Sequence, residues 1–328
     1  MVAVSFGDYA ATLFIGSNAA EVWSKVFATA VVLVMAALNV AGARGVDKAQ
    51  SAIVVALLAV FAVFVVATLS ELNPHLLAPS GYPSLRAIIS SVALTFFAYL
   101  GFSVISFTAG DLPRPERSLP RAMYTALGGT TALYVAISVG VFGTLTVAQV
   151  TKYGPTAVAE AARPALGDAG FTAVTIAALL ATSSSVNATL YASKGFTGTL
   201  AQVGQFPPVF GQQSRLGRSG GFLITVALIL LFSNLFDLSA IASVGSAVSL
   251  SVFVLVGIAG YRLRDEIKGD PRILALAVAA AGLVLAFFVI DTLRNDPGTF
   301  VAIVVLVIIA VVLDLAWKHA KAGKDARA

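Results

Sequence analysis

The chain has 328 residues, of which 58% are hydrophobic and 11% are charged, and its mean hydropathy is +0.92. Soluble domains carry about 25% charged residues, so this composition excludes a soluble protein and indicates an integral membrane protein. The absence of cysteine excludes disulfides and thiolate metal sites, and both histidines lie outside the apolar runs, so we expect no metal site.

The N-terminal residues 1–15 are amphipathic and lack the basic region of a signal peptide, so they look like the last half of a helix. Nine apolar segments follow, and most reach the roughly 20 residues that a hydrocarbon core of about 30 Å requires. The sixth is short, and the last two have no polar face and are predicted to be peripheral helices. The nine are Val26–Gly42, Ser51–Leu69, Ala87–Ala109, Ala122–Leu145, Phe171–Ser193, Phe222–Leu235, Leu238–Tyr261, Ile273–Ile290 and Thr299–Trp317.

The basic residues are unevenly divided between alternate loops. Of the 21 lysines and arginines, 16 lie in one set of loops and the C-terminal tail, and five lie in the other set. Positive residues gather on the cytoplasmic side of a membrane, which also explains the net charge of +5 without nucleic-acid binding. The sequence therefore predicts a multi-pass protein of the cytoplasmic membrane with residue 1 outside and a cytoplasmic C-terminus.

The third apolar segment contains a weak point for a helix. Gly101 stands there between Tyr99 and Phe102, and Ser103 follows. Glycine is a poor helix former, and an opened backbone at membrane depth survives only where protein or water surrounds it. The pattern fits the midplane binding site of a transporter, and it fits equally a glycine that only allows close helix packing.

The fifth segment carries five polar side chains within the six residues from Thr182 to Asn187. Such a run is costly against lipid, so it must face protein, water or ligand, and both interhelical hydrogen bonding and a binding site stay open. Its hard oxygen atoms suit Na⁺ better than a transition metal. No acidic or basic residue falls at a predicted midplane, so a carboxylate proton relay and an intramembrane enzyme both lack candidate residues.

Two neighbouring stretches resemble the amino acid–polyamine–organocation (APC) transporter family. F-F-A-Y-L-G-F at 96–102 and A-G-D-L-P-R-P-E-R-S-L-P-R at 109–121 are similar to that family's sixth helix and the loop after it, and 38–42, 204–210 and 238–264 agree more weakly. The resemblance implies an all-α, inverted-repeat (leucine-transporter-like) fold in a single transporter domain. Its parts would be a helix remnant at 1–15, the last two helices of the first repeat at 26–69, the second five-helix repeat at 87–261, two peripheral helices at 273–317 and a basic cytoplasmic tail at 318–328.

The resemblance also implies which residues bind substrate. Phe97 falls where an aromatic ring occludes the substrate, Ala98 and Tyr99 to Gly101 fall in or beside the unwound backbone, and Ser103 takes a position that some members fill with an acid. Asn187 is predicted to face the same cavity as Phe97 and Ser103.

Coupling to an ion is implied by the same resemblance. Ala181, Ser184 and Ser185 match the spacing of a sodium site in sodium-coupled relatives, whereas the lysine of some proton-coupled relatives has no counterpart between 53 and 69. The sequence departs from the family pattern at two places, with Gly110-Asp111 in place of an acidic pair and Arg114 in place of asparagine. The interactions that close the inner side of the transporter are therefore expected to differ from those of the family.

The sequence thus predicts a secondary permease that carries a small-molecule amino acid or amine by alternating access. Neutral amino acids are favoured because no midplane acid can pair with a cationic side chain. A polyamine or cationic amino acid exchanger and a non-transporting partner subunit stay open as alternatives. We expect contact with membrane lipid, and no catalytic residue, no resident cofactor and no nucleic acid, with Na⁺ or H⁺ as candidate coupling ions; the sequence does not indicate an oligomeric state. Because the resemblance begins at the third helix of the family, we also expect a truncated product that does not transport alone.

Overall fold

The computed structural model describes residues 1–16, 19–41, 46–78, 81–112, 114–211 and 220–325, which are mostly helical and contain no strand. This confirms the predicted all-α class. The chain forms two compact units, and each is drawn from two separate stretches. Unit 1 consists of Met1–Tyr82 and Phe102–Leu238, and unit 2 consists of Pro83–Gly101 and Ser239–Ala328. The predicted second repeat, residues 87–261, is therefore divided between the two units.

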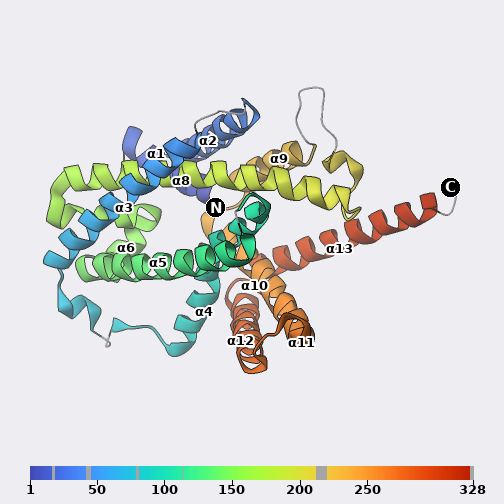
Figure 1. Cartoon of the computed structure of the whole chain (residues 1–328). Helices are drawn as coiled ribbons and strands as arrows, with labels where there is room; N and C mark the ends of the chain where they lie inside the picture. Colours follow the sequence, from blue (N-terminus) through green and yellow to red (C-terminus); the bar gives the residue numbers. More distant parts are fainter. Residues whose placement is uncertain (17–18, 42–45, 79–80, 113, 212–219, 326–328) are drawn as a thin grey trace. The chain divides into compact units, whose positions relative to one another are not determined.

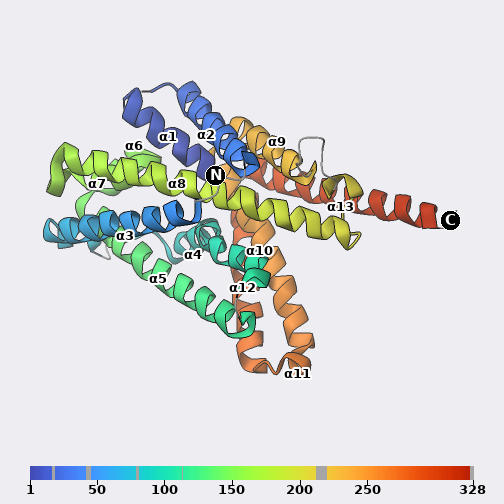
Figure 2. The same cartoon turned by 45° about the horizontal axis from the view of Figure 1, so that its top comes forward.

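Unit 1 is organised around the long helix α8 (Arg163–Gln202), as Figure 1 and Figure 2 show. Helix α8 contacts four other long or apolar helices, and α5 packs against α3. Short helical turns make most of the connections between them. The elements of the unit are α1 (Val2–Phe14), α2 (Glu21–Ala41), α3 (Val46–Ser70), η1 (Pro74–Leu77), the part of η3 (Phe96–Asp111) from Phe102 onward, α5 (Pro115–Thr144), α6 (Val147–Tyr153), η4 (Gly154–Thr156), α7 (Ala157–Ala161), α8, η5 (Pro208–Phe210) and α9 (Gly220–Leu235).

Small residues allow the helices of unit 1 to approach each other closely. A Cβ atom added to Gly7 of α1 would collide with the backbone carbonyl of Ser24 in α2. In the same way, a Cβ atom at Gly140 of α5 would collide with the side chain of Thr68 in α3. Helices in lipid associate through such close van der Waals contacts because lipid is as apolar as their own side chains. These two glycines therefore set the spacing of the pairs α1–α2 and α3–α5.

Unit 2 contains α4 (Leu85–Thr95), the first residues of η3 (Phe96–Asp111), α10 (Leu238–Arg262), α11 (Arg264–Ile267), α12 (Pro271–Asn295) and α13 (Pro297–Asp325). Ala247 and Leu250 of α10 and Phe288 of α12 form its buried apolar core, and Phe96 packs against them. Asp270 begins α12 as its N-cap, because its carboxylate accepts a hydrogen bond of 2.8 Å from the backbone N–H of Arg272. Phe96 is the first residue of η3, so its packing against this core connects the start of η3 to α10.

Eight helical stretches within the described residues are long and apolar enough to cross a membrane, rather than the nine predicted. The predicted segment outside this set is the short sixth one, Phe222–Leu235, which lies in α9; that helix has 16 residues and is shorter than a full span. The outward faces of the long helices carry large exposed apolar side chains, such as Leu276 and Leu313, which are 70% and 64% exposed. Apolar surface of this extent is expected where helices face lipid.

The third predicted segment differs from its expected form. The segment 87–109 is predicted as one apolar helix with a weak point at Gly101, but the α-helix ends at Thr95 and a 3₁₀-helix continues to Asp111. The change of helix type therefore begins at Phe96, five residues before the glycine. The physical reason is tertiary, because the backbone N–H of Phe97 donates a hydrogen bond of 3.2 Å to the hydroxyl of Ser246 in α10.

Candidate functional site

The predicted substrate segment lies at the junction between α4 and η3 in unit 2. The backbone N–H of Phe96 still donates to the carbonyl of Val92 and completes the last α-helical turn. The next N–H, that of Phe97, donates instead to Ser246. Tyr99 and Gly101 then lie within a 3₁₀-helix rather than in the unwound backbone that the family resemblance implies. The junction nevertheless departs from the α-helix within the stretch where the resemblance places the substrate.

The side chain of Phe97 is half-buried against α10. A Cβ atom added to Gly245 would lie closer than 3.0 Å to two ring atoms of Phe97, a separation that real Cβ atoms essentially never show. The ring therefore lies directly on the backbone of Gly245. Among the described residues, no heavy atom lies within 4 Å of a Cβ atom added to Gly101.

The other predicted substrate residues fall in unit 1. Ser103 is half-buried in η3, and Asn187 is half-buried in α8. The amide oxygen of Asn187 accepts a hydrogen bond of 2.6 Å from Nδ2 of Asn39 in α2, and Nδ2 of Asn39 also donates to the carbonyl of Met35 at 3.0 Å. Asn187 is thus part of a polar contact between two helices. A cavity that it shares with Phe97 and Ser103 stays a prediction.

The hydroxyl run on α8 divides into two groups. Thr182 and Ser183 donate hydrogen bonds to carbonyl oxygens of their own helix, at 2.7 Å to Ala178 and 3.0 Å to Leu180. Hydroxyls used in this way need no partner on another helix. Ser184 and Ser185, which are predicted to bind sodium with Ala181, are half-buried on the same helix. The local bonds therefore account for two of the five polar groups in the run.

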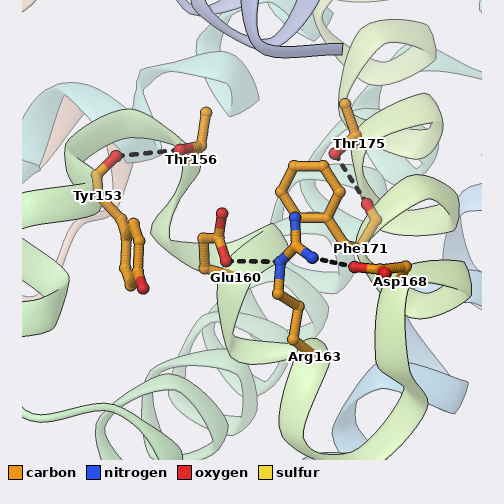
Figure 3. Close-up of polar contacts among 7 residues, drawn as sticks. All are labelled: Tyr153, Thr156, Glu160, Arg163, Asp168, Phe171 and Thr175. Carbon is orange, nitrogen blue, oxygen red and sulfur yellow. Dashed lines mark hydrogen bonds and ion pairs between the residues drawn. The ribbon is translucent and has the colours of Figure 1, made fainter. Parts of the chain in front are cut away.

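A polar cluster that the sequence analysis missed lies at the corner before α8. Figure 3 shows Arg163 at its centre: Nε donates to Oε2 of Glu160 at 2.7 Å, and Nη1 pairs with Asp168. The guanidinium lies over the ring of Phe171, with its Cζ 4.1 Å from the ring centroid. Glu160 is only 9% exposed, whereas the side chains of Arg163 and Asp168 are 40% and 87% exposed, so only the glutamate is largely removed from water.

The backbone supports the same corner. Gly167 lies inside the stretch assigned to α8 with φ +62° and ψ −158°, a conformation that residues with a Cβ atom rarely adopt. Figure 3 also shows Thr156 and Thr175 donating to the carbonyls of Tyr153 and Phe171 on either side of Arg163, at 3.0 Å and 2.8 Å. The available signal in the sequence was Glu160 three residues before Arg163, a spacing that brings opposite charges together on one helical turn. This cluster fixes the start of α8.

The long apolar helices, their exposed apolar faces and an interrupted helix define a multi-pass membrane protein of the transporter class. The model of the amino acid permease family matches residues 1–321, which is nearly the whole chain. The chain belongs to this family of the APC superfamily, as the motif at 96–121 predicts.

Relatives agree with this assignment. The inner membrane transport protein YbaT of Escherichia coli is 28% identical over 321 residues, which cover 98% of this chain and 75% of YbaT. The methylthioribose transporter of Bacillus subtilis is 24% identical, over 83% of this chain and 60% of its own length. The serine/threonine exchanger SteT of Bacillus subtilis is 26% identical, over 89% of this chain and 68% of SteT. The chain thus spans between 60% and 75% of these relatives, and all three are transporters rather than enzymes.

Proposed function

We propose that the protein, as part of a complete carrier, moves amino acids across the cytoplasmic membrane by alternating access and binds them at the α4–η3 junction. The observation that carries the proposal is the end of the α-helix at Thr95, inside the stretch that resembles the substrate segment of the family. Transporters hold substrate at discontinuous helices, where backbone groups can reach the ligand. Under this proposal, Phe97, Ala98, Tyr99 and Gly101 contact the substrate.

Neutral amino acids are the proposed substrate class, with Ser103 and Asn187 as further contacts. The stretch from Phe96 to Ser103 contains aromatic, aliphatic and hydroxyl side chains and no acid. A cationic substrate side chain held there would lack a charged partner, and an unpaired charge at membrane depth is costly. The name of SteT, a serine/threonine exchanger, supports the same class.

Uptake of radiolabelled serine into proteoliposomes, with competition by unlabelled amino acids, tests the proposal. We expect serine and threonine to compete and arginine and polyamines to compete weakly. In a complete carrier, Phe97→Ala is expected to weaken binding by about 1–3 kcal/mol, the loss typical of a central aromatic contact. Phe236→Ala serves as a matched control, because that ring stacks on Phe232 at the end of α9 with centroids 5.3 Å apart. Stronger competition by a dication than by serine would refute the substrate class.

Sodium coupling at Ala181, Ser184 and Ser185 is part of the same proposal. Support comes from the spacing of these residues and from their half-buried position on α8. Ser185→Ala is expected to abolish stimulation by sodium, since it removes one oxygen ligand without leaving a large cavity. Ser183→Ala is the control, because that hydroxyl donates to the carbonyl of Leu180 in its own helix. Uptake that is equally fast in sodium and in choline medium would refute the coupling.

A further inference from the structure

The junction between α4 and η3 draws its support from α10, 149 residues further along the chain. The last N–H of the α-helical ladder, that of Phe96, donates to Val92, and the N–H of Phe97 donates at 3.2 Å to Oγ of Ser246. Ser246 is fully buried, so this hydrogen bond is shielded from water. A backbone N–H without a partner in such a place costs about 1–3 kcal/mol. Ser246 thus satisfies the donor at the point where the helix changes type.

Two aromatic rings dock on the same helix beside this hydrogen bond. Phe97 lies on the backbone of Gly245, where any side chain larger than hydrogen would collide with its ring. Phe96 meets Phe253 edge to face, with ring centroids 5.6 Å apart and an interplanar angle of 85°. Gly245 and Phe253 are eight residues apart, which places them about two turns apart on one face of α10. The glycine, the serine and the phenylalanine therefore form one docking face for the junction.

The helix type makes this docking necessary. A 3₁₀-helix rarely extends beyond three or four residues because its hydrogen bonds have poor geometry, and η3 extends over 16 residues. A conformation of this kind persists where the surrounding structure holds it. Contacts with its first turn come from Gly245, Ser246 and Phe253 of α10.

We propose that Gly245 and Ser246 are positioning residues through which α10 fixes the backbone of the substrate segment. The hydroxyl holds the first N–H beyond α4, and the glycine admits the ring of Phe97. A displacement of α10 at these two residues would release the junction and change the geometry that a substrate meets. The expected change in substrate binding rests on the proposed function, whereas the coupling of α10 to the α4–η3 junction does not depend on it.

Hydrogen–deuterium exchange of the purified full chain, measured without substrate on overlapping peptides around Phe97, tests the coupling. Ser246→Ala removes the acceptor and is expected to speed exchange at the Phe97 amide about 3- to 10-fold, the effect of one lost hydrogen bond. Ser251→Ala is the matched control on the same helix, because its hydroxyl donates to the carbonyl of Ala247. Exchange at Phe97 that is the same in the parent and in Ser246→Ala would overturn the proposal.

A second pair of variants tests the contact between Gly245 and the ring. Gly245→Ala is expected to speed exchange at Phe97 by about tenfold, because the added methyl group displaces the ring. In a Phe97→Ala background the same change is expected to have less than about a twofold effect, since the colliding ring is gone. Gly282→Ala in α12 is the control, as its methyl group would meet no described heavy atom within 4 Å. Equal effects of Gly245→Ala in both backgrounds would overturn the assigned contact.

Binding of radiolabelled serine separates this proposal from the proposed function. Ser246→Ala is expected to weaken serine affinity by about the same 3- to 10-fold while Ser251→Ala leaves it unchanged. A parent chain that binds no amino acid would refute the proposed function and leave the exchange results standing. Unchanged affinity in Ser246→Ala, together with faster exchange, would overturn the link from α10 to the substrate.

Discussion

The hydrogen bond between Asn39 and Asn187 offers a direct test of how α2 and α8 are held together. Nδ2 of Asn39 lies 2.6 Å from Oδ1 of Asn187, and both side chains are half-buried. Side-chain hydrogen bonds between membrane helices contribute about 0.6 kcal/mol on average and at most about 1.7 kcal/mol. We expect a coupling energy within that range between Asn39→Ala and Asn187→Ala, with the short distance favouring its upper half.

The two single variants are expected to differ. After Asn187→Ala, Nδ2 of Asn39 still donates to the carbonyl of Met35 at 3.0 Å. After Asn39→Ala, the amide oxygen of Asn187 loses its donor, so this variant should be the less stable one. Reversible unfolding in mixed micelles, measured for the parent, both single variants and the double variant, gives the coupling as a departure from additivity. Additive effects within about 0.3 kcal/mol would refute the contact.

Three further predictions follow from the corner before α8, the connection before α13 and the loop charges. Arg163→Gln leaves buried Glu160 without its cation and is expected to cost about 1–3 kcal/mol of unfolding free energy, which Arg163→Lys restores only in part. The pKa of Asp296 is lowered by hydrogen bonds from the side chain and backbone of Thr299. Its stabilising effect is therefore present above the ordinary carboxylate range and lost as pH falls through the folded-state pKa, so Asp296→Asn should flatten the acid limb of the unfolding profile. Reporters fused at Thr156 and at Gln213, which lies outside the described residues, should lie on opposite sides of the membrane; the same side for both would refute the topology.

The apolar segments could be predicted because the hydropathy of a segment depends only on the residues within it. The predicted segments 273–290 and 299–317 lie inside α12 and α13, and the short sixth segment lies inside α9. The ends of α12 were less predictable, because Asp270 caps it beyond the apolar run. Helix ends depend on single capping contacts, which hydropathy does not measure.

The candidate site was predictable only in part. The motif around Gly101 indicated a disturbed helix, but the change of helix type begins at Phe96, where Ser246 supplies a hydrogen-bond acceptor from 149 residues away. Likewise, the run of polar residues on α8 gave no means of separating Thr182, which bonds to its own helix, from Asn187, which bonds to Asn39 148 residues away. Such partners follow from tertiary packing, and no local pattern in a single sequence specifies them.

Polar groups at membrane depth in this chain differ in the freedom that they leave to the helices. The hydroxyl of Thr182 donates within its own helix and restrains no neighbour. The pair Asn39–Asn187 joins two side chains, and so it tolerates small helix shifts through rotation of the amides. Ser246 instead holds a backbone N–H of another element, which side-chain rotation cannot follow. A shift of α10 at Ser246 must therefore move the backbone at Phe97 or break the hydrogen bond, and this places the strictest mechanical link on the segment that we propose contacts the substrate.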